Sequence, residues 1–259
     1  MTRDTKSGTP QGGILSPLLV NIALSVLDEH FAEAWERDMA TRTQRATRRN
    51  HREPTYRIIM YADDFVVMVH GTRAHAEGLR TEVEAALSSV GLRLNEEKTS
   101  VCHIDEGFDF LGFRIQRQVK RGSNKAFIYT WPSRKSLSSV MARVKAITRQ
   151  GTNNPLSDLL RQINGVLWGW TNYFRHGVSK DTFAYLHQFT WLRIVRWLRR
   201  KHRRANWGWL RRRYLANAWW PEHDDESLFD CRAVTVTRYR YRYRGAAIPS
   251  PWVGKIEAA

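Results

Sequence analysis

The pattern of apolar and polar residues differs between the two halves of the chain. The first half mixes helical and strand patterns, and the second half is mainly helical. Apolar residues at steps of three and four predict helices over 17–37, 76–90, 136–149, 156–174 and about 181–201. Short apolar runs predict two strands around a turn at 62–64, and further strands over 100–104, 108–116 and 126–131. This order indicates an α+β domain followed by an all-α bundle.

Two adjacent aspartates interrupt the most apolar stretch of the first half. The runs 58–61 and 65–69 flank Ala62, Asp63 and Asp64, so a tight turn should carry both carboxylates at its tip. We expect strands buried on both faces, where neighbouring negative charges are costly unless a cation compensates them. Mg²⁺ bound together with substrate phosphates is the simplest such cation. The alternative is a solvated turn in which both aspartates bond only their own backbone.

Two polar segments border the first predicted helix. Residues 8–13 form a glycine-rich loop before Ser16 and Pro17, which are typical helix-starting residues. Such a loop can approach a phosphate closely, or it can simply lead into the helix. Residues 37–57 are rich in arginine, and we interpret them as a partly disordered surface insertion that touches nucleic-acid backbone, or equally as a solvated loop.

The positive charge of the chain lies almost entirely in its second half. The formal net charge is +17; residues 1–130 hold 18 basic and 17 acidic side chains, and residues 131–259 hold 24 and 8. A polyanion attracts such a surface through counterion release, so nucleic acid is the favoured partner. Anionic lipid is the rival, but no single amphipathic helix stands apart as an anchor.

Arginines and tryptophans in the second half form the candidate nucleic-acid interface. Four arginines recur at near-helical steps with few acids to neutralise them, which favours phosphate tracking over a solvated face. Residues 206–214 then interleave aromatic rings with arginines, a composition suited to stacking on unpaired bases, although some rings should belong to the core. The candidate residues are Arg193, Arg196, Arg200, Arg204, Trp207, Arg211 and Arg212.

Several classes of protein are not supported. Cys102 and Cys231 form no CxxC and no cluster with histidines, which argues against a disulfide framework or a zinc site. No apolar run approaches the ~20 residues needed to cross a bilayer, and the first residues lack a signal-peptide pattern, so we expect no membrane partner and a cytoplasmic location. No nuclease motif is recognisable, and target-strand cleavage is not expected.

Together these motifs resemble the group II intron-encoded reverse transcriptases, also called maturases. Four stretches carry the likeness in the family's order: GTPQGGILSPL at 8–18, YADD at 61–64, GLRLNEEKT at 91–99 and FLGF at 110–113. A fifth, GVLWGWTNYF at 165–174 with Trp191 and Leu192, resembles the thumb or maturase region that separates intron maturases from other bacterial reverse transcriptases. The resemblance covers most of residues 8–215.

The resemblance implies roles for several residues. In a palm of antiparallel strands and packed helices, Asp63 would ligate metal and Asp64 would assist or ligate, with two Mg²⁺ ions activating the primer 3′-hydroxyl. Gln11 and Gly12 would lie near the incoming nucleotide and template. Lys98 would face the phosphates of the dNTP, or else pair with neighbouring glutamates on a solvated turn. The implied primer grip consists of Phe110, Leu111, Gly112 and Phe113.

The resemblance also implies partners and an organisation. The partners are intron RNA, a template-primer duplex and dNTPs, and a DNA target stays open. A partial palm would span 1–131, a thumb/maturase helical domain 132–215, and a basic C-terminal tail 216–259. In that tail the alternation RYRYRYR at 238–244 would put tyrosines on one face of a strand and arginines on the other.

The chain departs from the family pattern at its start. Reverse transcriptases carry another metal-binding aspartate upstream of the Pro-Gln-Gly-Gly loop and fingers that cover the nucleotide, whereas seven residues precede Gly8. Asp4 lies in a polar segment and does not replace that aspartate. We therefore expect a truncated chain or a split half, completed by an N-terminal fragment in trans, whose two-metal site is incomplete. A non-catalytic RNA-binding splicing factor is the alternative.

Overall fold

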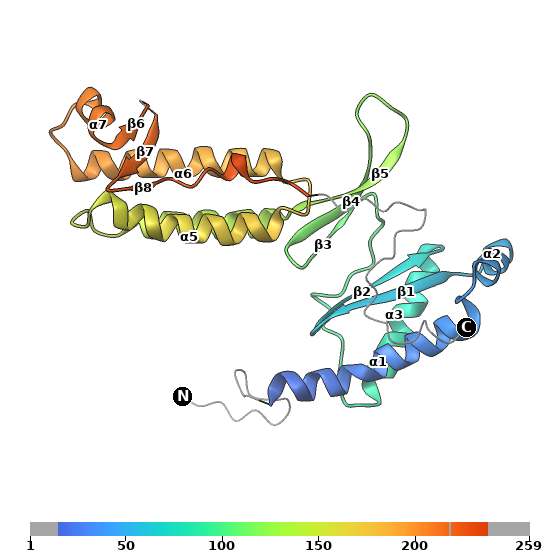
Figure 1. The fold of residues 1–259 in the computed structure, drawn as a ribbon. Helices are drawn as coiled ribbons and strands as arrows, with labels where there is room; N and C mark the ends of the chain where they lie inside the picture. The colour runs from blue at the N-terminus through green and yellow to red at the C-terminus, as the bar shows by residue number, and fades with distance from the viewer. Residues whose placement is uncertain (1–14, 218, 238–259) are drawn as a thin grey trace, which may run out of the picture. The chain divides into compact units, whose positions relative to one another are not determined.

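The protein folds into two compact units, Met1–Leu111 and Gly112–Ala259. The computed structural model describes residues 15–217 and 219–237, and Figure 1 shows their helices and strands in chain order. Each unit contains its own hydrophobic core. Helices combine with small antiparallel sheets, so the predicted α+β class is confirmed.

Unit 1 packs two helices against a β-hairpin. Its elements are α1 (Ser16–Asp38), α2 (Arg42–Asn50), β1 (Thr55–Tyr61), β2 (Asp64–His70), α3 (Arg73–Ser88) and β3 (Phe108–Phe110). Leu27 and Phe31 of α1 meet Leu79 and Val83 of α3 in the core, all at most 5% exposed. These contacts confirm the helical periods predicted for 17–37 and 76–90.

The hairpin of β1 and β2 is buried on one face only. Ile58, Val67 and Val69 pack on the core of α1 and α3, whereas Ile59 and Tyr61 on the other face are 49% and 64% exposed. The prediction that both faces are buried is wrong, because in the described part of unit 1 the two helices cover a single face. The hairpin therefore alternates as a half-solvated antiparallel pair does.

The arginine-rich segment after α1 forms the capped helix α2 and not the partly disordered insertion or loop that its composition predicts. The Thr41 side chain accepts from the Gln44 backbone N–H at 3.1 Å, and the Gln44 side chain accepts from the Thr41 N–H at 2.9 Å. Arg45 donates to the carbonyl oxygen of Ala40 at 2.7 Å, just beyond the end of α1. No residue of α2 is buried, so polar contacts position this helix.

Unit 2 is a helical bundle that begins with a hairpin. Its elements are β4 (Phe113–Val119), β5 (Ala126–Pro132), α4 (Arg134–Arg149), α5 (Leu156–Phe174), α6 (Lys180–Lys201) and α7 (Trp207–Tyr214), followed by β6 (Leu215–Ala216), β7 (Trp220–His223), β8 (Glu226–Ser227) and the short helix η1 (Cys231–Ala233). Leu160, Ile163 and Leu167 of α5 meet Phe183 and Ile194 of α6, and all five are fully buried. The helices predicted for this half are confirmed, with ends shifted by at most two residues.

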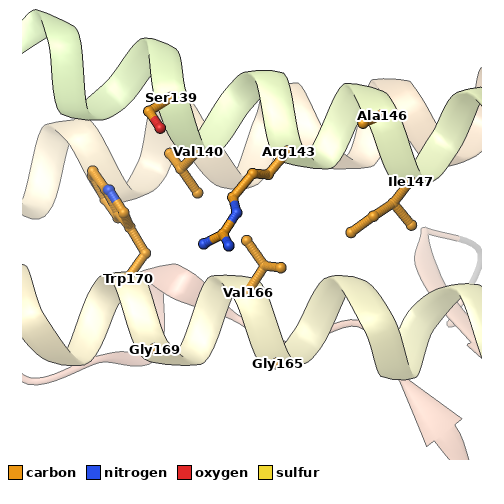
Figure 2. A pocket seen from close by; sticks show the side chains of 9 residues that line it. All are labelled: Ser139, Val140, Arg143, Ala146, Ile147, Gly165, Val166, Gly169 and Trp170. Atoms are coloured by element: carbon orange, nitrogen blue, oxygen red, sulfur yellow. The ribbon is translucent and has the colours of Figure 1, made fainter. Parts of the chain in front are cut away.

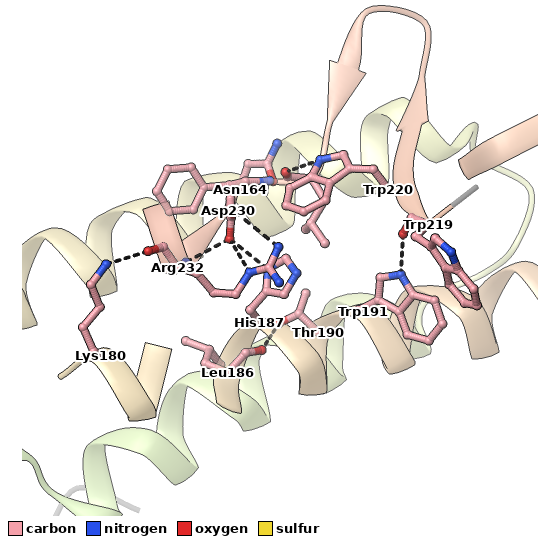
Figure 3. Close-up of polar contacts among 12 residues, drawn as sticks. Asn164, Lys180, Leu186, His187, Thr190, Trp191, Trp219, Trp220, Asp230 and Arg232 are labelled. Carbon is pink, nitrogen blue, oxygen red and sulfur yellow. Dashed lines mark hydrogen bonds and ion pairs between the residues drawn. The ribbon is translucent and has the colours of Figure 1, made fainter. Parts of the chain in front are cut away.

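The segment from β7 to η1 runs back along α5 and α6 (Figures 1 and 3). Asn164 binds this segment twice: its amide nitrogen donates to the Ser227 carbonyl, and its amide oxygen accepts from the Phe229 N–H, both at 2.8 Å. Lys180 donates to the carbonyl oxygens of Arg232 at 2.7 Å and Val234 at 3.1 Å. The segment is therefore an integral part of the bundle.

A buried histidine lies under this segment. His187 of α6 stacks on Trp220 with ring centroids 5.2 Å apart, and its Nδ1 lies 3.6 Å from a carboxylate oxygen of Asp230 (Figure 3). Burial lowers the pKa of His187, the positive charge of Arg232 lowers it further, and Asp230 opposes the shift. His187 is therefore held neutral beside the ion pair of Asp230 and Arg232.

Two strand predictions are wrong. Residues 100–104 adopt no regular strand, because this short run has no partner strand in the described structure to satisfy its hydrogen bonds. The strand predicted for 108–116 is divided by a turn at Leu111 and Gly112, whose φ values of 48° and 78° are incompatible with a continuous strand. The predicted arginine–tyrosine strand at 238–244 lies outside the described residues.

The division into units falls earlier than the predicted domain boundary. The compact units meet between Leu111 and Gly112, whereas we predict the palm to end at residue 131, so the β4–β5 hairpin packs with the helical unit. The boundaries 1–131, 132–215 and 216–259 stay predictions. Within 15–217 and 219–237, no helix combines the length and apolar character that crossing a membrane requires.

Candidate functional site

Asp63 and Asp64 lie at the tip of the β1–β2 hairpin, as the sequence predicts. Tyr61 pairs with Asp64 across the hairpin, which leaves a two-residue loop of Ala62 and Asp63. Ala62 has a φ of 53°, a left-handed conformation that tight hairpin loops use and that is unusual for alanine. Both aspartates are exposed, so no burial cost requires a cation, contrary to our expectation from the sequence.

A second aspartate pair in the chain differs from the first in how its carboxylates are used. Asp224 and Asp225 form the turn between β7 and β8, where Asp224 pairs with the Nδ1 of His223 at 2.7 Å and accepts from the Ser157 hydroxyl at 3.3 Å. Asp63 and Asp64 have no ion pair or side-chain hydrogen bond with any other described residue. Their carboxylates are therefore available for a ligand.

The Asp63–Asp64 turn fits a magnesium ion only in part. One or two carboxylates, together with substrate phosphates and water, are a common Mg²⁺ environment, and the unengaged oxygens of this turn suit it. The described residues contain no group of three or more Asp, Glu, His or Cys side chains that could hold a metal ion. A two-metal site would therefore need ligands from outside the described residues.

The other predicted nucleotide-binding residues are only partly placed. Gln11 and Gly12 lie outside the described residues. Lys98 is exposed on a turn organised by Asn95, whose side-chain oxygen accepts from the backbone N–H of Glu97 at 3.0 Å and of Lys98 at 3.3 Å. Lys98 pairs with neither neighbouring glutamate within the described structure, so its ammonium group faces solvent.

The predicted primer grip, residues 110–113, forms a turn that straddles the two units. In unit 2, the Gly112 carbonyl accepts from the Ser133 N–H at 2.8 Å and from the Ser136 hydroxyl at 3.0 Å. The Phe113 ring packs on Phe174 with a centroid distance of 4.8 Å. The start of α4 and the end of α5 thus fix the position of Gly112 and Phe113.

The structure gathers arginines from α4 and α6 into one cluster. Arg193 donates to the Thr148 hydroxyl at 3.0 Å, and Arg200 donates to the Thr148 carbonyl. Burial lowers the pKa of Arg193, and the positive charges of Arg149, Arg196 and Arg200 lower it further. None of these four arginines has a carboxylate partner within the described ranges, so their mutual repulsion is unrelieved. The cluster is therefore suited to bind an anion.

A basic recess continues this cluster beyond the end of α6. It has a volume of about 590 Å³ and is lined by Thr152, Arg200, Lys201, His202, Arg203, Arg204 and Ala205. The prediction that Arg204 continues the helical row of arginines is wrong, because α6 ends at Lys201 and Arg204 lies on the turn that follows. Arg204 nevertheless lines the recess together with Arg200. Lys201 is used internally, because its ammonium group donates to the carbonyl oxygens of Thr152 and Asn154 at 2.7 and 2.8 Å.

The aromatic residues of α7 serve mainly as packing. Trp207 packs against the core of unit 2, and the Arg199 guanidinium lies 5.4 Å from its ring centroid. Arg211 and Arg212 are exposed and have no carboxylate partner in the described structure. The predicted role of Trp207 in stacking on bases thus competes with an observed role in the core.

An apolar groove separates α4 from α5 (Figure 2). Its volume is about 570 Å³, and it is lined by Ser139, Val140, Arg143, Ala146, Ile147, Gly165, Val166, Gly169 and Trp170. The groove is open above Gly165 and Gly169, since a Cβ added at either glycine would meet no atom within 4 Å. Arg143 is the one charged group in this lining, so the groove is distinct from the arginine cluster.

Sequence reasoning missed Arg149 as a member of the cluster. It ends α4 and lies far along the chain from α6, so helical spacing within α6 could not reveal it. The unusual excess of cations over residues 131–259 was the available signal, but charge counts do not say which helices meet.

Two family models match different parts of the chain. The model described as "Reverse transcriptase (RNA-dependent DNA polymerase)" matches residues 1–115. The model described as "Group II intron, maturase-specific domain" matches residues 137–215. The first match includes the acidic turn, and the second includes all four residues of the arginine cluster.

Three curated relatives match the chain, and the names of two of them refer to introns. The chain is 36% identical to Protein YkfC of Escherichia coli (strain K12), covering 52% of this chain and 39% of the relative. It is 28% identical to the Group II intron-encoded protein LtrA of Lactococcus lactis subsp. cremoris, covering 43% of this chain and 26% of the relative. It is 23% identical to the Putative COX1/OXI3 intron 2 protein of Saccharomyces cerevisiae, covering 68% of this chain and 23% of the relative.

The chain spans at most two fifths of the length of these relatives. The order of the two matches along the chain is the order that the sequence motifs predict, with the palm-type motifs first and the maturase region after them. The first part of the chain is therefore similar to reverse transcriptases and the second part to the maturase domain of group II introns, and this is the likeness that the sequence motifs indicate.

Proposed function

We propose that the chain contributes the acidic palm turn and the RNA-binding thumb of an RNA-directed DNA polymerase that also helps its intron RNA to splice. The observation that carries this proposal is the unengaged pair Asp63 and Asp64 at an exposed hairpin tip, in contrast to Asp224 in the other acidic turn, which is held by His223 and Ser157. A turn whose carboxylates have no structural partner is free to bind metal and phosphate.

In this proposal each group has a defined task. Bound Mg²⁺ supplies activation of the primer 3′-hydroxyl and charge neutralisation at the phosphates. Asp63 and Asp64 hold the ion, Lys98 meets the phosphates of the dNTP, and residues 110–113 support the primer end. Gln11 and Gly12 face the incoming nucleotide and template. The unneutralised arginines of α4 and α6 hold the RNA backbone.

Primer extension on an RNA template with Mg²⁺ tests the catalytic part. We expect Asp63→Asn to abolish product, because it removes a metal-binding charge at an exposed position where folding is unaffected. Asp225→Asn is the matched control: it changes an exposed aspartate in the other acidic turn, and full activity is expected. The assay is run with the chain alone and with the fingers-containing part of a homologous reverse transcriptase added in trans.

The outcomes separate the catalytic forms of the proposal. Product only with the added part would identify a split enzyme, and product from the chain alone would identify a complete active site. No product under either condition would refute polymerase activity of this polypeptide. Equal loss for Asp63→Asn and Asp225→Asn would refute the assignment of metal binding to the Asp63–Asp64 turn.

The second candidate function is a non-catalytic RNA-binding splicing factor. The arginine cluster favours it, because Arg149, Arg193, Arg196 and Arg200 repel one another without any described carboxylate nearby. Replacement of Arg149 and Arg196 by glutamine should lower the salt dependence of RNA affinity by a log–log slope of about 1.4, as expected for two phosphate contacts at ~0.7 each. Asp63→Ala should leave RNA affinity unchanged. An unchanged slope in the double variant would remove this cluster from the interface.

A further inference from the structure

The hairpin of β4 and β5 forms a ribbon that extends past the helices of unit 2 (Figure 1). Its register is continuous from Phe113 opposite Pro132 to Val119 opposite Ala126. A tight turn closes the tip, where the Lys120 N–H donates to the Lys125 carbonyl at 2.9 Å. The inner end is anchored on the bundle, but nearly every residue over 117–128 is exposed.

The outer half of this ribbon exposes apolar side chains on both of its faces. Val119 and Ile128 lie on one face and are 64% and 61% exposed, and Phe127 lies on the other at 47%. Phe127 shares its face with the half-buried rings of Tyr129 and Trp131, because side chains two apart on a strand point the same way. The apolar side chains left exposed on the outer half of the ribbon indicate a surface that a ligand covers.

The charge around the ribbon identifies the class of ligand. Residues 110–157 contain ten lysines and arginines and no aspartate or glutamate. Three of these cations, Lys120, Arg121 and Lys125, are exposed at the tip. They have no ion pair with any other described residue, so the tip presents a concentrated positive charge next to an exposed ring.

We propose that the outer half of the β4–β5 ribbon, residues 117–128, is a binding surface for single-stranded RNA. Phe127 stacks on an unpaired base, and Lys120, Arg121 and Lys125 contact the flanking phosphates. Aromatic rings beside cations favour unpaired over duplex RNA, because paired bases do not expose their faces. This inference rests on the proposed RNA binding and adds a second contact surface, separate in the chain from the arginine cluster.

Fluorescence anisotropy with the full chain tests the ribbon directly. The probes are a short labelled oligouridylate and a blunt RNA duplex of the same length. We expect Phe127→Ala and Phe127→Leu each to weaken oligouridylate binding about tenfold, within the range measured for one base stacked on an aromatic ring, and to leave duplex binding unchanged. The leucine variant keeps an apolar side chain, so a loss of oligouridylate affinity in this variant would show that the aromatic ring itself is needed.

The tip cations are tested by salt dependence. Replacement of Lys120, Arg121 and Lys125 by glutamine should lower the log–log salt slope for oligouridylate by about 2, as expected for three contacts at ~0.7 each. The matched control replaces three arginines of unit 1 that lie outside the candidate nucleic-acid contacts, Arg73, Arg80 and Arg93, by glutamine. This change removes the same charge, and we expect it to lower the slope less.

Each result bears on the ribbon. The ribbon proposal would be overturned if the Phe127 and tip variants bound RNA with wild-type affinity while the Arg149 and Arg196 variant lost affinity. RNA binding by the cluster would then stand, and a protein would be the better candidate to cover the ribbon. An equal loss of slope in the unit 1 control would show that net charge sets affinity, and would also overturn it. Absence of RNA binding by the unaltered chain would refute the proposed function together with the ribbon.

Discussion

Substitution of Gly112 by alanine should destabilise unit 2 more than the same change at Gly122. Both glycines have nearly the same left-handed backbone, with φ values of 78° and 77°. A Cβ at Gly112 would lie 2.9 Å from the Ser136 hydroxyl oxygen and 3.3 Å from the Phe174 ring, whereas a Cβ at Gly122 would meet no atom within 4 Å. The pair therefore separates backbone strain from packing.

The expected magnitudes follow from these surroundings. An L-residue in the left-handed region costs about 1–2 kcal/mol, and both variants bear that cost. At Gly112 the Ser136 hydroxyl must also rotate away and lose its bond to the Gly112 carbonyl, about 1 kcal/mol, while overpacking against Phe174 adds about 1–3 kcal/mol. We expect about 1–2 kcal/mol of destabilisation for Gly122→Ala and about 3–6 kcal/mol for Gly112→Ala.

Urea unfolding followed by tryptophan fluorescence measures the difference. Of the eleven tryptophans, Trp35 alone lies in unit 1, so the signal reports unit 2. Ser136→Ala in the Gly112→Ala background should recover part of the loss, because it removes the clashing oxygen. Equal destabilisation of the two glycine variants, or no recovery in the double variant, would show that the packing reasoning is incorrect.

Three further predictions concern unit 2 and the thiols. Burial depresses the pKa of His187 below its ordinary 6.5, so the unfolded chain binds the extra proton first as the pH falls. Unit 2 should therefore lose stability below pH 6.5. Urea titrations at several pH values measure this loss, and His187→Phe should reduce it. Cys102 should react rapidly with a thiol reagent in the native protein, whereas Cys231, buried and with its pKa raised to about 12, should react only after unfolding; two fast thiols would contradict this. Leu167→Ala should cost about 2–5 kcal/mol in thermal or urea unfolding because Leu167 is fully buried, against less than about 1 kcal/mol for Leu192→Ala at a 40% exposed position.

Helices were the most predictable part of this chain. The stripe from Leu156 to Phe174 appears in the structure with the same ends, because its apolar positions repeat over five turns and leave one face to bury. The acidic turn was equally predictable, since two β-branched runs around Ala62, Asp63 and Asp64 specify a hairpin locally. In both cases the signal lies within one element.

Predictions failed where distant parts of the chain decide the outcome. The burial of the β1–β2 hairpin depends on which faces α1 and α3 cover, and apolar content does not specify this. The helix α2 depends on a capping box at Thr41 and on Arg45, which composition alone treats as features of a loop. Arg149 joins the arginine cluster only through the packing of α4 on α6. Which helices pack together is a tertiary property, so the spacing of arginines within either helix could not predict it.

Not every cation in this basic protein is available to a polyanion. Lys201 binds backbone carbonyl oxygens of the α4–α5 connection, and Lys180 binds those of Arg232 and Val234 at the end of the segment that runs back along α5 and α6. Neutralising either ammonium, by acylation or by substitution, would act first on the architecture and only secondarily on affinity for RNA. In this chain the hydrogen-bond partners of a lysine, more than its positive charge, determine whether it stabilises the fold or is available to bind RNA.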